Sequence, residues 1–320
     1  MTNLSTIQFF DFHPPLADLK QEVLSGLAEQ PKAISPKFFY DEYGSQLFDK
    51  ITELPEYYPA RTEMAILKAH RQEMTAYLGE ECLLLELGSG NSQKIRLLLE
   101  ALRPAIYMPM DISKDFLLHS AQALADDYPD LEVHAACVDY STEFHLPHYP
   151  ETMPRAAFFP GSSIGNFEPK DAQVLLQRIA QVLGKDAHLL IGVDLKKDPQ
   201  QLNAAYNDTQ GITAAFNLNL LTRINRELKA DFELEQFIHQ AFYNEAYGRV
   251  EMHLVSEAPQ HVRIDGHAFS FHEQESIHTE NSYKYTIEQF HSLAALSGFV
   301  AQEVWSDAEQ LFSVHCLRVI

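Results

Sequence analysis

The sequence predicts an α/β protein with a parallel sheet that binds a ligand at the carboxyl ends of its strands. Three observations support this prediction. Short apolar runs alternate along residues 82–195 with segments of helical periodicity. Three successive runs end in or beside an acid, namely Glu86, Asp111 and Asp139. A glycine-x-glycine turn follows the first run.

The first run, residues 82–87, leads into a polar helix start through Gly88 and Gly90. Glycine suits this turn because a Cβ atom would block the close approach of the backbone to a ligand. The two glycines alone are a weak signal. A dinucleotide fingerprint requires a third glycine where this chain has Gln93, which argues against a nicotinamide-dependent dehydrogenase.

The next two runs extend the predicted ligand site. Residues 105–111 end in Asp111, which follows Gly88 by about the 20 residues expected of an acid that binds two ribose hydroxyls. Residues 131–139 end in Asp139, which suits an adenine amino group. Each acid taken singly is also typical of a helix N-cap. Three acids at successive strand ends favour a binding site.

Two further strands complete the predicted parallel sheet. They are expected over residues 155–163, which end in a Pro-Gly turn, and over residues 187–195, which end near Asp194. Helical patterns over Lys94–Leu102 and Asp171–Leu183 separate the strands. This alternation is typical of parallel α/β sheets.

The N-terminal part of the chain has a different pattern. Residues 1–60 contain no clear parallel strand and predict helices over Ala17–Glu29 and Pro36–Leu54. An amphipathic helix is expected over Thr62–Leu78, with its first residue as N-cap and Gly79 just beyond its end.

The C-terminal part combines helices with antiparallel strands. Residues 196–230 predict polar-rich helices, and residues 237–285 alternate as antiparallel strands do. A helix over Thr286–Ser297 follows. Residues 299–319 predict a long hairpin with its turn near Asp307.

The segment CLLLELGSGNSQK at 82–94 resembles motif I of class I S-adenosylmethionine (SAM) methyltransferases. In these enzymes the acid, here Glu86, helps to shape the site for the methionine end of SAM, and the glycines face the cofactor. Their sheet also finishes with a reversed last strand, as the predicted hairpin would. The resemblance implies a Rossmann-like fold that binds SAM and releases S-adenosylhomocysteine.

This resemblance predicts two domains. Residues 61–195 and 286–320 would form the SAM-binding domain. Residues 1–60 and 196–285 would form a second, mixed α+β domain that binds the substrate. We expect the substrate between the two domains, where ligand sites tend to occur.

Composition limits the partners and the compartment. The formal net charge is −21, and an acidic surface argues against nucleic acid and anionic membranes as partners. No signal peptide opens the chain, and no apolar run reaches the ~18 residues of a transmembrane helix. Cys82, Cys137 and Cys316 lie in predicted strands, as free thiols of a cytoplasmic protein do. The histidines show no HExxH spacing, and no paired CxxC is present, so no metal site is expected.

Six sequence blocks resemble the histidine-specific methyltransferase family, whose best-known member makes hercynine, the trimethylated histidine used for ergothioneine. The blocks are FFYDEYGSQLFDKITELPEYYPARTE (38–63), LELGSGNSQK (85–94), PGSSIGNFEP (160–169), YNDTQGITAAFNLN (206–219), VEM (250–252) and HTENS (278–282). They span most of the chain in the expected order, so the match is specific. It implies SAM-dependent methylation of the α-amino nitrogen of L-histidine, in three steps, by a monomer.

The resemblance also implies roles for individual residues. Tyr40 would lie near the reacting centre with Asn166, which also holds the amino-acid head group. The remaining substrate contacts would come from Tyr57, Gly161, Tyr206, Met252, Glu280 and Ser282, of which the last two grip the imidazole. The cofactor contacts would come from Glu86, Gly88, Gly90, Lys94, Asp111, Asp139 and Tyr140. Tyr140 departs from the expected Phe but keeps an aromatic ring for stacking.

Ordinary structural explanations exist for the same residues. Tyr57 is also typical of a packing aromatic, Tyr206 of a helix face and Met252 of core filler. Glu280 is also typical of a solvated strand edge, and Lys94 of a surface helix start. The sequence alone therefore leaves both explanations open for each residue.

The residue types suit N-methylation by SAM. The sulfonium methyl is already activated, so the enzyme has to align a neutral amine with the methyl–sulfur axis. Tyrosine and asparagine bind the nitrogen without holding it as ammonium, whereas Glu280 suits an imidazole N–H and favours histidine over tryptophan or tyrosine. Two alternatives stay open: methylation of another aromatic amino acid or histidine derivative, and a non-catalytic SAM-binding protein.

Overall fold

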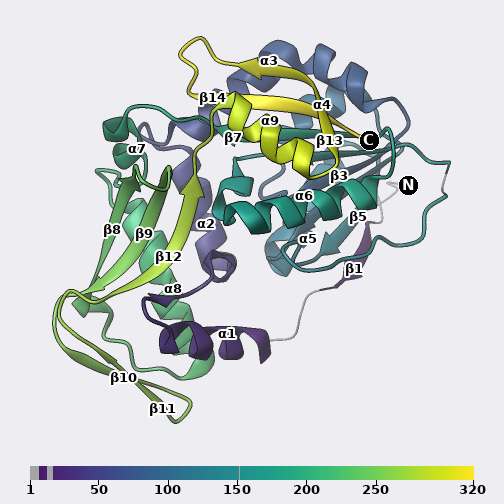
Figure 1. Cartoon of the computed structure of the whole chain (residues 1–320). Helices are drawn as coiled ribbons and strands as arrows, with labels where there is room; N and C mark the ends of the chain where they lie inside the picture. Colours follow the sequence, from purple (N-terminus) through teal and green to yellow (C-terminus); the bar gives the residue numbers. More distant parts are fainter. Residues whose placement is uncertain (1–6, 13–16, 151) are drawn as a thin grey trace. The chain divides into compact units, whose positions relative to one another are not determined.

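The computed structural model describes residues 7–12, 17–150 and 152–320, and the chain divides into two compact units (Figure 1). The first unit comprises residues 1–13, 59–196 and 283–320, and the second comprises residues 14–58 and 197–282. Parts of the predicted N-terminal domain segment, residues 1–6 and 13–16, lie outside the described residues.

Within the described residues, the first unit contains an eight-stranded sheet in the order β1-β5-β4-β3-β6-β7-β14-β13. The strands are β1 (Gln8–Asp11), β3 (Leu83–Leu87), β4 (Ile106–Asp111), β5 (Glu132–Cys137), β6 (Arg155–Phe159), β7 (His188–Asp194), β13 (Phe299–Ser306) and β14 (Phe312–Val319). Neighbours from β1 to β7 are parallel, whereas β14 is antiparallel to both β7 and β13. The predicted α/β class I methyltransferase fold, with its reversed strand, is confirmed.

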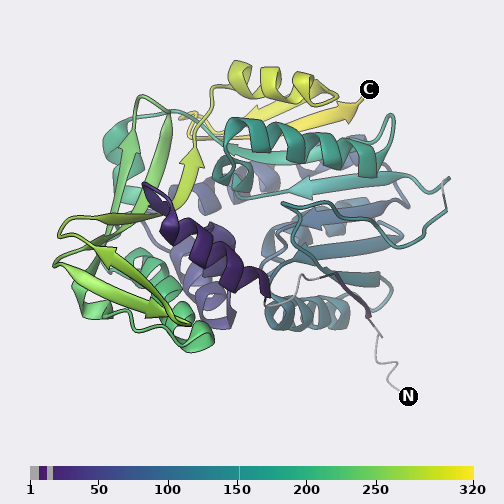
Figure 2. The same cartoon turned by 60° about the horizontal axis from the view of Figure 1, so that its bottom comes forward.

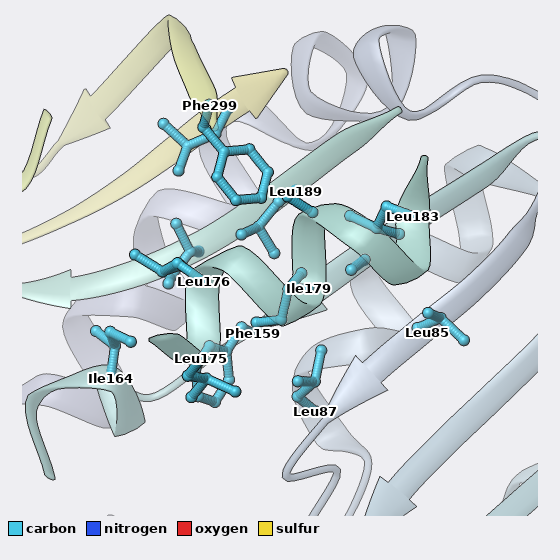
Figure 3. Packing of buried hydrophobic residues seen from close by; sticks show 14 of the residues in the cluster. Leu85, Leu87, Phe159, Ile164, Leu175, Leu176, Ile179, Leu183, Leu189 and Phe299 are labelled. Carbon is cyan, nitrogen blue, oxygen red and sulfur yellow. The ribbon is translucent and has the colours of Figure 1, made fainter. Parts of the chain in front are cut away.

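Apolar side chains cover both faces of this sheet because successive strand residues point to opposite sides. The helices of the unit are α3 (Tyr58–Leu78), α4 (Gln93–Leu102), α5 (Lys114–Asp127), α6 (Pro169–Leu183) and α9 (Ile287–Leu296). Leu85 and Leu87 of β3 belong to one buried cluster with α6 and α9, and Figure 3 shows α6 packed there. Leu84 belongs to a second cluster with α3, α4 and α5. Strands buried on both faces have continuous apolar sequences, which explains why the sequence revealed them.

The expectation that residues 1–60 contain no parallel strand is wrong. β1 lies parallel to β5, with Phe9 opposite Ala135 and Phe10 opposite Ala136. This edge strand has four residues, and none of its side chains is fully buried. It therefore lacks the apolar run by which the central strands were recognised.

The predicted helix Pro36–Leu54 is interrupted. A short 3-10 helix, η1 (Pro36–Phe39), precedes α2 (Glu42–Thr52). Asp41 separates them because its carboxylate accepts a hydrogen bond from the backbone N of Gly44 at 2.8 Å and so caps α2.

Two other helix ends test the predicted caps. Thr62 is not an N-cap, since α3 already begins at Tyr58. Pro59 at the start of α3 favours this earlier beginning because its fixed φ suits the first turn of a helix. Thr286 does cap α9, in a capping box with Gln289.

The second unit contains a four-stranded sheet in the order β2-β12-β9-β8 within the described residues (Figure 2). Its strands are β2 (Lys32–Ala33), β8 (Phe237–Asn244), β9 (Arg249–Ser256) and β12 (Ser276–Tyr283), and a separate hairpin joins β10 (Gln260–Ile264) to β11 (His267–Phe271). Its helices are α1 (Ala17–Ala28), α2, α7 (Pro199–Ala205) and α8 (Ile212–Leu228), with 3-10 helices η1 and η3 (Leu234–Gln236). The pair β8–β9 is antiparallel, as the alternation over 237–285 predicts, but β10 was not recognised as a strand.

Two further observations bear on the environment of the chain. Among the described residues, no helix combines the length and the apolar character needed to cross a membrane. Cys82, Cys137 and Cys316 are free and buried. Burial raises the pKa of each thiol, to about 11 for Cys82 and about 12 for the other two. These thiols are therefore unreactive at neutral pH.

Candidate active site

The glycine turn after β3 brings several predicted cofactor residues together in the first unit. Gly88 and Gly90 have φ values of +69° and +51°, which only glycine adopts readily. The backbone N of Gly90 donates to Asp111 Oδ2 at 3.1 Å. A Cβ on Gly88 would lie 3.3 Å from the hydroxyl of Tyr140. The turn, the acid at the end of β4 and the aromatic residue after β5 therefore share one site.

Asp111 and Asp139 are held by the loops that follow their strands. Ser113 N donates to Asp111 Oδ1 at 3.0 Å, and Ser141 N donates to Asp139 Oδ1 at 2.9 Å. Burial raises the pKa of Asp111, while backbone N–H donors oppose the rise. The backbone N–H groups of Gly90, Ile112 and Ser113 all interact with Asp111. A carboxylate has about four acceptor sites, so Asp111 can also accept a donor from a ligand.

Glu86 occupies a drier position than the other two acids. It is 1% exposed and accepts a hydrogen bond from the hydroxyl of Tyr107. Burial raises the pKa of Glu86 to about 8. The protonated form therefore dominates near pH 7, and Glu86 acts there as a hydrogen-bonding group rather than as a full negative charge.

Ser89, between the two glycines, indicates that a ligand completes the turn. Its Oγ is buried and has no hydrogen-bond partner among the described residues. A buried hydroxyl without a partner costs about 1–3 kcal/mol. A turn with two glycines, an unpartnered hydroxyl and an acid that can accept another donor together fit a nucleoside cofactor.

Lys94 and Gly161, predicted for cofactor and substrate respectively, meet at a residue that the sequence analysis missed. Lys94 Nζ lies 2.6 Å from Glu63 Oε2, and Gly161 N donates to both oxygens of Glu63 at 2.9 and 3.0 Å. Glu63 is completely buried in α3. A signal was present, because Glu63 lies three and four residues before the buried Ile66 and Leu67, on the same helix face.

Asn166 ends a 3-10 helix, η2 (Ser163–Asn166), that follows β6. This helix packs closely on the backbone of Tyr283. A Cβ on Gly165 would lie 2.7 Å from the carbonyl oxygen of Tyr283, so only glycine fits. The close packing fixes the backbone immediately before Asn166.

A buried ion pair, also missed from the sequence, stabilises the same region of the first unit. Lys284 Nζ lies 2.7 Å from Asp194 Oδ2, and both side chains are 1% exposed. The backbone N of Asp194 donates to Ser162 Oγ at 2.9 Å. Because an unpaired buried charge is costly, the pair fixes the end of β7 against the segment that leaves β12.

The second unit brings three predicted substrate residues together. The hydroxyl of Tyr206 donates to Ser282 Oγ at 2.8 Å, and the rings of Tyr206 and Tyr57 lie 6.2 Å apart at an angle of 71°. The carbonyl oxygen of Tyr206 accepts a hydrogen bond from His239 Nε2 at 2.9 Å. Tyr206 is therefore fixed at both its backbone and its hydroxyl.

Tyr40 belongs to an aromatic cluster in the same unit. Its ring lies 5.7 Å from the rings of both Phe48 and Phe216. Phe48 also contacts the ring of Tyr57 at 6.4 Å. Edge-to-face packing of this kind holds aromatic rings in defined orientations. Tyr40 and Tyr57 thus both contact one phenylalanine.

Met252 and Glu280 lie on neighbouring strands of the second unit. Met252, on β9, is 2% exposed, and its carbonyl oxygen accepts a hydrogen bond from Thr279 Oγ1 at 3.1 Å. Thr279 precedes Glu280 on β12, and its hydroxyl shares its single proton between this carbonyl oxygen and Asn217 Oδ1, which lies 2.8 Å away. The predicted substrate residues are divided between the units, since Gly161 and Asn166 belong to the first.

Among the described residues, Glu251, His253 and His278 place metal-ligand atoms within 4.8 Å of one another. Their arrangement is better explained without a metal. Glu251 already accepts a hydrogen bond from Arg249 Nε at 2.8 Å, which neutralises its charge. The rings of His253 and His278 stack at 4.8 Å with 19° between their planes, so their in-plane lone pairs do not point to one centre. We assign no metal to this cluster.

Comparison with known proteins gives consistent matches. A family model described as "Histidine-specific methyltransferase, SAM-dependent" matches residues 19–319. A histidine N-alpha-methyltransferase of Mycolicibacterium smegmatis is 41% identical and matches 90% of this chain and 91% of its own length. Ergothioneine biosynthesis protein 1 of Neurospora crassa is 32% identical over 94% of this chain and 35% of its own length. A 4-dimethylallyltryptophan N-methyltransferase of Aspergillus fumigatus is 26% identical over 96% and 98%.

Proposed function

Because the chain belongs to the histidine-specific, SAM-dependent methyltransferase family, we propose that it methylates the α-amino nitrogen of L-histidine. Three transfers give hercynine, the trimethyl betaine used for ergothioneine. The observation that carries this proposal is the 41% identity, over nine-tenths of both chains, to a histidine N-alpha-methyltransferase.

In this proposal the first unit binds the cofactor. Asp111 accepts the ribose hydroxyls, Asp139 accepts the adenine amino group, and Tyr140 stacks on the base. The Ser89 hydroxyl, buried and without a partner among the described residues, and the two glycines that flank it support this assignment. When bound, SAM supplies a methyl group that its sulfonium sulfur has already made electrophilic.

The head group of histidine is held by Tyr57, Tyr206 and Asn166. These neutral side chains form hydrogen bonds without stabilising an ammonium ion, so the amine keeps the lone pair that attacks the methyl group. Support comes from the bond of the Tyr206 hydroxyl to Ser282 and from its contact with Tyr57. Tyr40 or solvent accepts the proton that the amine releases.

Glu280 and Ser282 recognise the imidazole, and Met252 lines the side-chain pocket. A carboxylate forms a strong, charge-assisted hydrogen bond with an imidazole N–H. A second acceptor or donor at Ser282 satisfies the other ring nitrogen, which an indole or phenol does not have. A substrate with an indole or phenol ring would leave a polar group of Glu280 or Ser282 without a partner, so the site favours histidine.

Mass spectrometry of the product tests the proposal. The purified chain is incubated with SAM and L-histidine, and the expected result is a gain of three methyl groups on histidine. An unchanged histidine mass, with SAM still bound in calorimetry, would contradict the proposal and favour another amine or a non-catalytic SAM-binding protein.

A second substrate class merits a parallel assay because one relative is named for 4-dimethylallyltryptophan. L-tryptophan and a thiol-histidine derivative compete with histidine in one mixture at limiting SAM. We expect methyl transfer to histidine alone. Preferential methylation of either competitor would move the substrate assignment while keeping the reaction type.

We further propose a monomer in a reducing, cytoplasmic compartment. The free, buried state of Cys82, Cys137 and Cys316 supports the compartment, since oxidising compartments favour disulfides. The family resemblance supports the monomer. Light scattering after gel filtration gives the mass in solution, and a dimer mass would contradict this part of the proposal.

A further inference from the structure

Glu63 is an acidic residue that is fully buried in the first unit. Its exposure is 0%, and its helix neighbours Ile66 and Leu67 are equally excluded from water, at 3% and 0%. A carboxylate in such surroundings persists only with close, well-directed partners. Its position therefore has to be explained by what it binds.

The partners of Glu63 come from two segments that follow neighbouring parallel strands. Lys94 is the second residue of α4, the helix after β3, and its Nζ lies 2.6 Å from Glu63 Oε2. Gly161 follows β6, and its backbone N donates to Oε1 and Oε2 at 3.0 and 2.9 Å. One carboxylate therefore links Lys94, predicted to bind the cofactor, to Gly161, predicted to bind the substrate.

Two glycines permit this arrangement. A Cβ on Gly192 of β7 would lie 2.1 Å from Glu63 Oε1, which is a severe clash. A Cβ on Gly161 would lie 3.5 Å from Lys94 Nζ. That distance is an ordinary van der Waals contact, so Gly161 is required for its φ of +79° rather than for space. The missing side chain of Gly192 is what leaves room for the Glu63 carboxylate.

We infer that Glu63 is a positioning residue for methyl transfer, an inference that rests on the proposed function. Glu63 takes one of the three N–H donors of Lys94 and directs the others toward the carboxylate at the amino-acid end of SAM. The Lys94 side chain is 21% exposed, so without Glu63 it would turn toward solvent. The same carboxylate fixes the Gly161 loop that leads to Asn166, which couples cofactor binding to substrate placement.

Calorimetric titration with S-adenosylhomocysteine tests the inference in the full chain. Glu63→Gln keeps the volume but removes the negative charge that pairs with Lys94. We expect the Kd to rise about 10-fold or more, as for the loss of one charge-assisted hydrogen bond. Glu73→Gln on the same helix is the matched control, because Glu73 is 64% exposed, and its Kd should stay unchanged. An unaltered Kd in Glu63→Gln would overturn the inference.

A double-mutant cycle separates positioning from general structural support. If Glu63 acts through Lys94, then Glu63→Gln should change the Kd less than about 2-fold in a Lys94→Met background. If the effects of the two substitutions on the Kd were fully additive, Glu63 would not act through Lys94. Should Glu63→Gln fail to fold, Glu63→Asp serves the same titration, since its shorter side chain withdraws from Lys94 but keeps the charge.

The titration does not require histidine to be the substrate. A raised Kd in Glu63→Gln, with no methylation of histidine by the wild-type protein, would contradict the proposed substrate and support the role of Glu63 at the cofactor. Methylation of histidine, with a normal Kd in Glu63→Gln, would support the substrate and contradict the role of Glu63.

Discussion

At the residue scale, acidic side chains of similar sequence context have different roles because their partners differ. Asp111 accepts backbone N–H groups at the end of a strand, whereas Glu86 shares a dry site with Tyr107. Glu63 is neutralised by Lys94. Motif resemblance identified the first two acids as candidates, but it gave no information on their charge state, which depends on burial.

Glu280 provides the residue-scale test of substrate recognition. Glu280→Ala should lower kcat/KM for histidine about 10- to 100-fold, since a hydrogen bond to a charged group contributes about 1.5–3 kcal/mol. The Kd for S-adenosylhomocysteine should not change, because the proposed cofactor residues are elsewhere in the chain. Glu273→Ala, at an exposed position of the preceding turn, is the control. Intact histidine turnover in Glu280→Ala would show that the imidazole assignment is wrong.

At the element scale, the sequence predicted best those strands that are buried on both faces. β3 and β6 were evident from their apolar runs, whereas the edge strand β1 was not. Strand β10 was also missed, although the turn that joins it to β11 is Asp265-Gly266 with φ values of +45° and +84°. An Asp-Gly pair is a strong hairpin signal, so this strand pair was predictable from turn chemistry.

Gly165 tests how closely η2 has to pack. Gly165→Ala should lower kcat for histidine methylation and the melting temperature together, because its Cβ would meet the carbonyl oxygen of Tyr283 at 2.7 Å. Overpacking of this kind costs about 1–3 kcal/mol. Affinity for S-adenosylhomocysteine is the internal control and should be retained. Normal kcat in the variant would mean that Asn166 does not depend on this contact.

Asp41 tests the start of α2. Its carboxylate accepts hydrogen bonds from Gly44 N, Asn219 Nδ2 and Arg226 Nη2 at 2.8, 2.9 and 2.7 Å. Asp41→Ala should lower the free energy of unfolding by about 1–2 kcal/mol, as measured by urea denaturation, because the cap is lost. Asp41→Asn should lose less, since asparagine is also a good N-cap.

The pH dependence of this effect has a defined sign. Burial raises the pKa of Asp41, but the bonds from Arg226, Gly44 and Asn219 outweigh it and hold the pKa below 3.8. The contribution of Asp41 is therefore complete above pH ~4 and is lost as the pH falls through the lowered pKa. Equal acid sensitivity of the wild-type and Asp41→Asn proteins would contradict this account.

At the scale of the whole molecule, each unit is assembled from separate parts of the chain. The strands of the first unit come from both sides of the segment 197–282, and residues of the second unit flank α3 and β7 in sequence. The net charge of −21 is a property of the whole chain. It argued only against two classes of partner, nucleic acid and anionic membranes. Each unit depends on contacts between distant segments, which local patterns do not reveal.

The raised pKa of Glu86 makes the stability of the whole protein depend on pH. Its pKa is raised to about 8 in the folded state by burial, from 4.5 when unfolded. The unfolded chain loses this proton first, so stability should fall as the pH rises from about 5 to 8. Glu86→Gln should remove that part of the decline in melting temperature of the cofactor-free protein. An identical pH profile for the variant would show that Glu86 is ionised when folded.

The sequence by itself determined the central strands of the first unit, the glycine turn and the family blocks, because hydrophobic periodicity and motif spacing are local properties of the chain. Tyr57, Tyr206, Glu280 and Ser282 became candidates in this way. Only the tertiary structure decided which buried polar groups are partners. Glu63 lies 31 residues from Lys94 and 98 from Gly161, and no local pattern links them. Such pairs exist because the fold excludes water from them, and burial is decided by the complete chain.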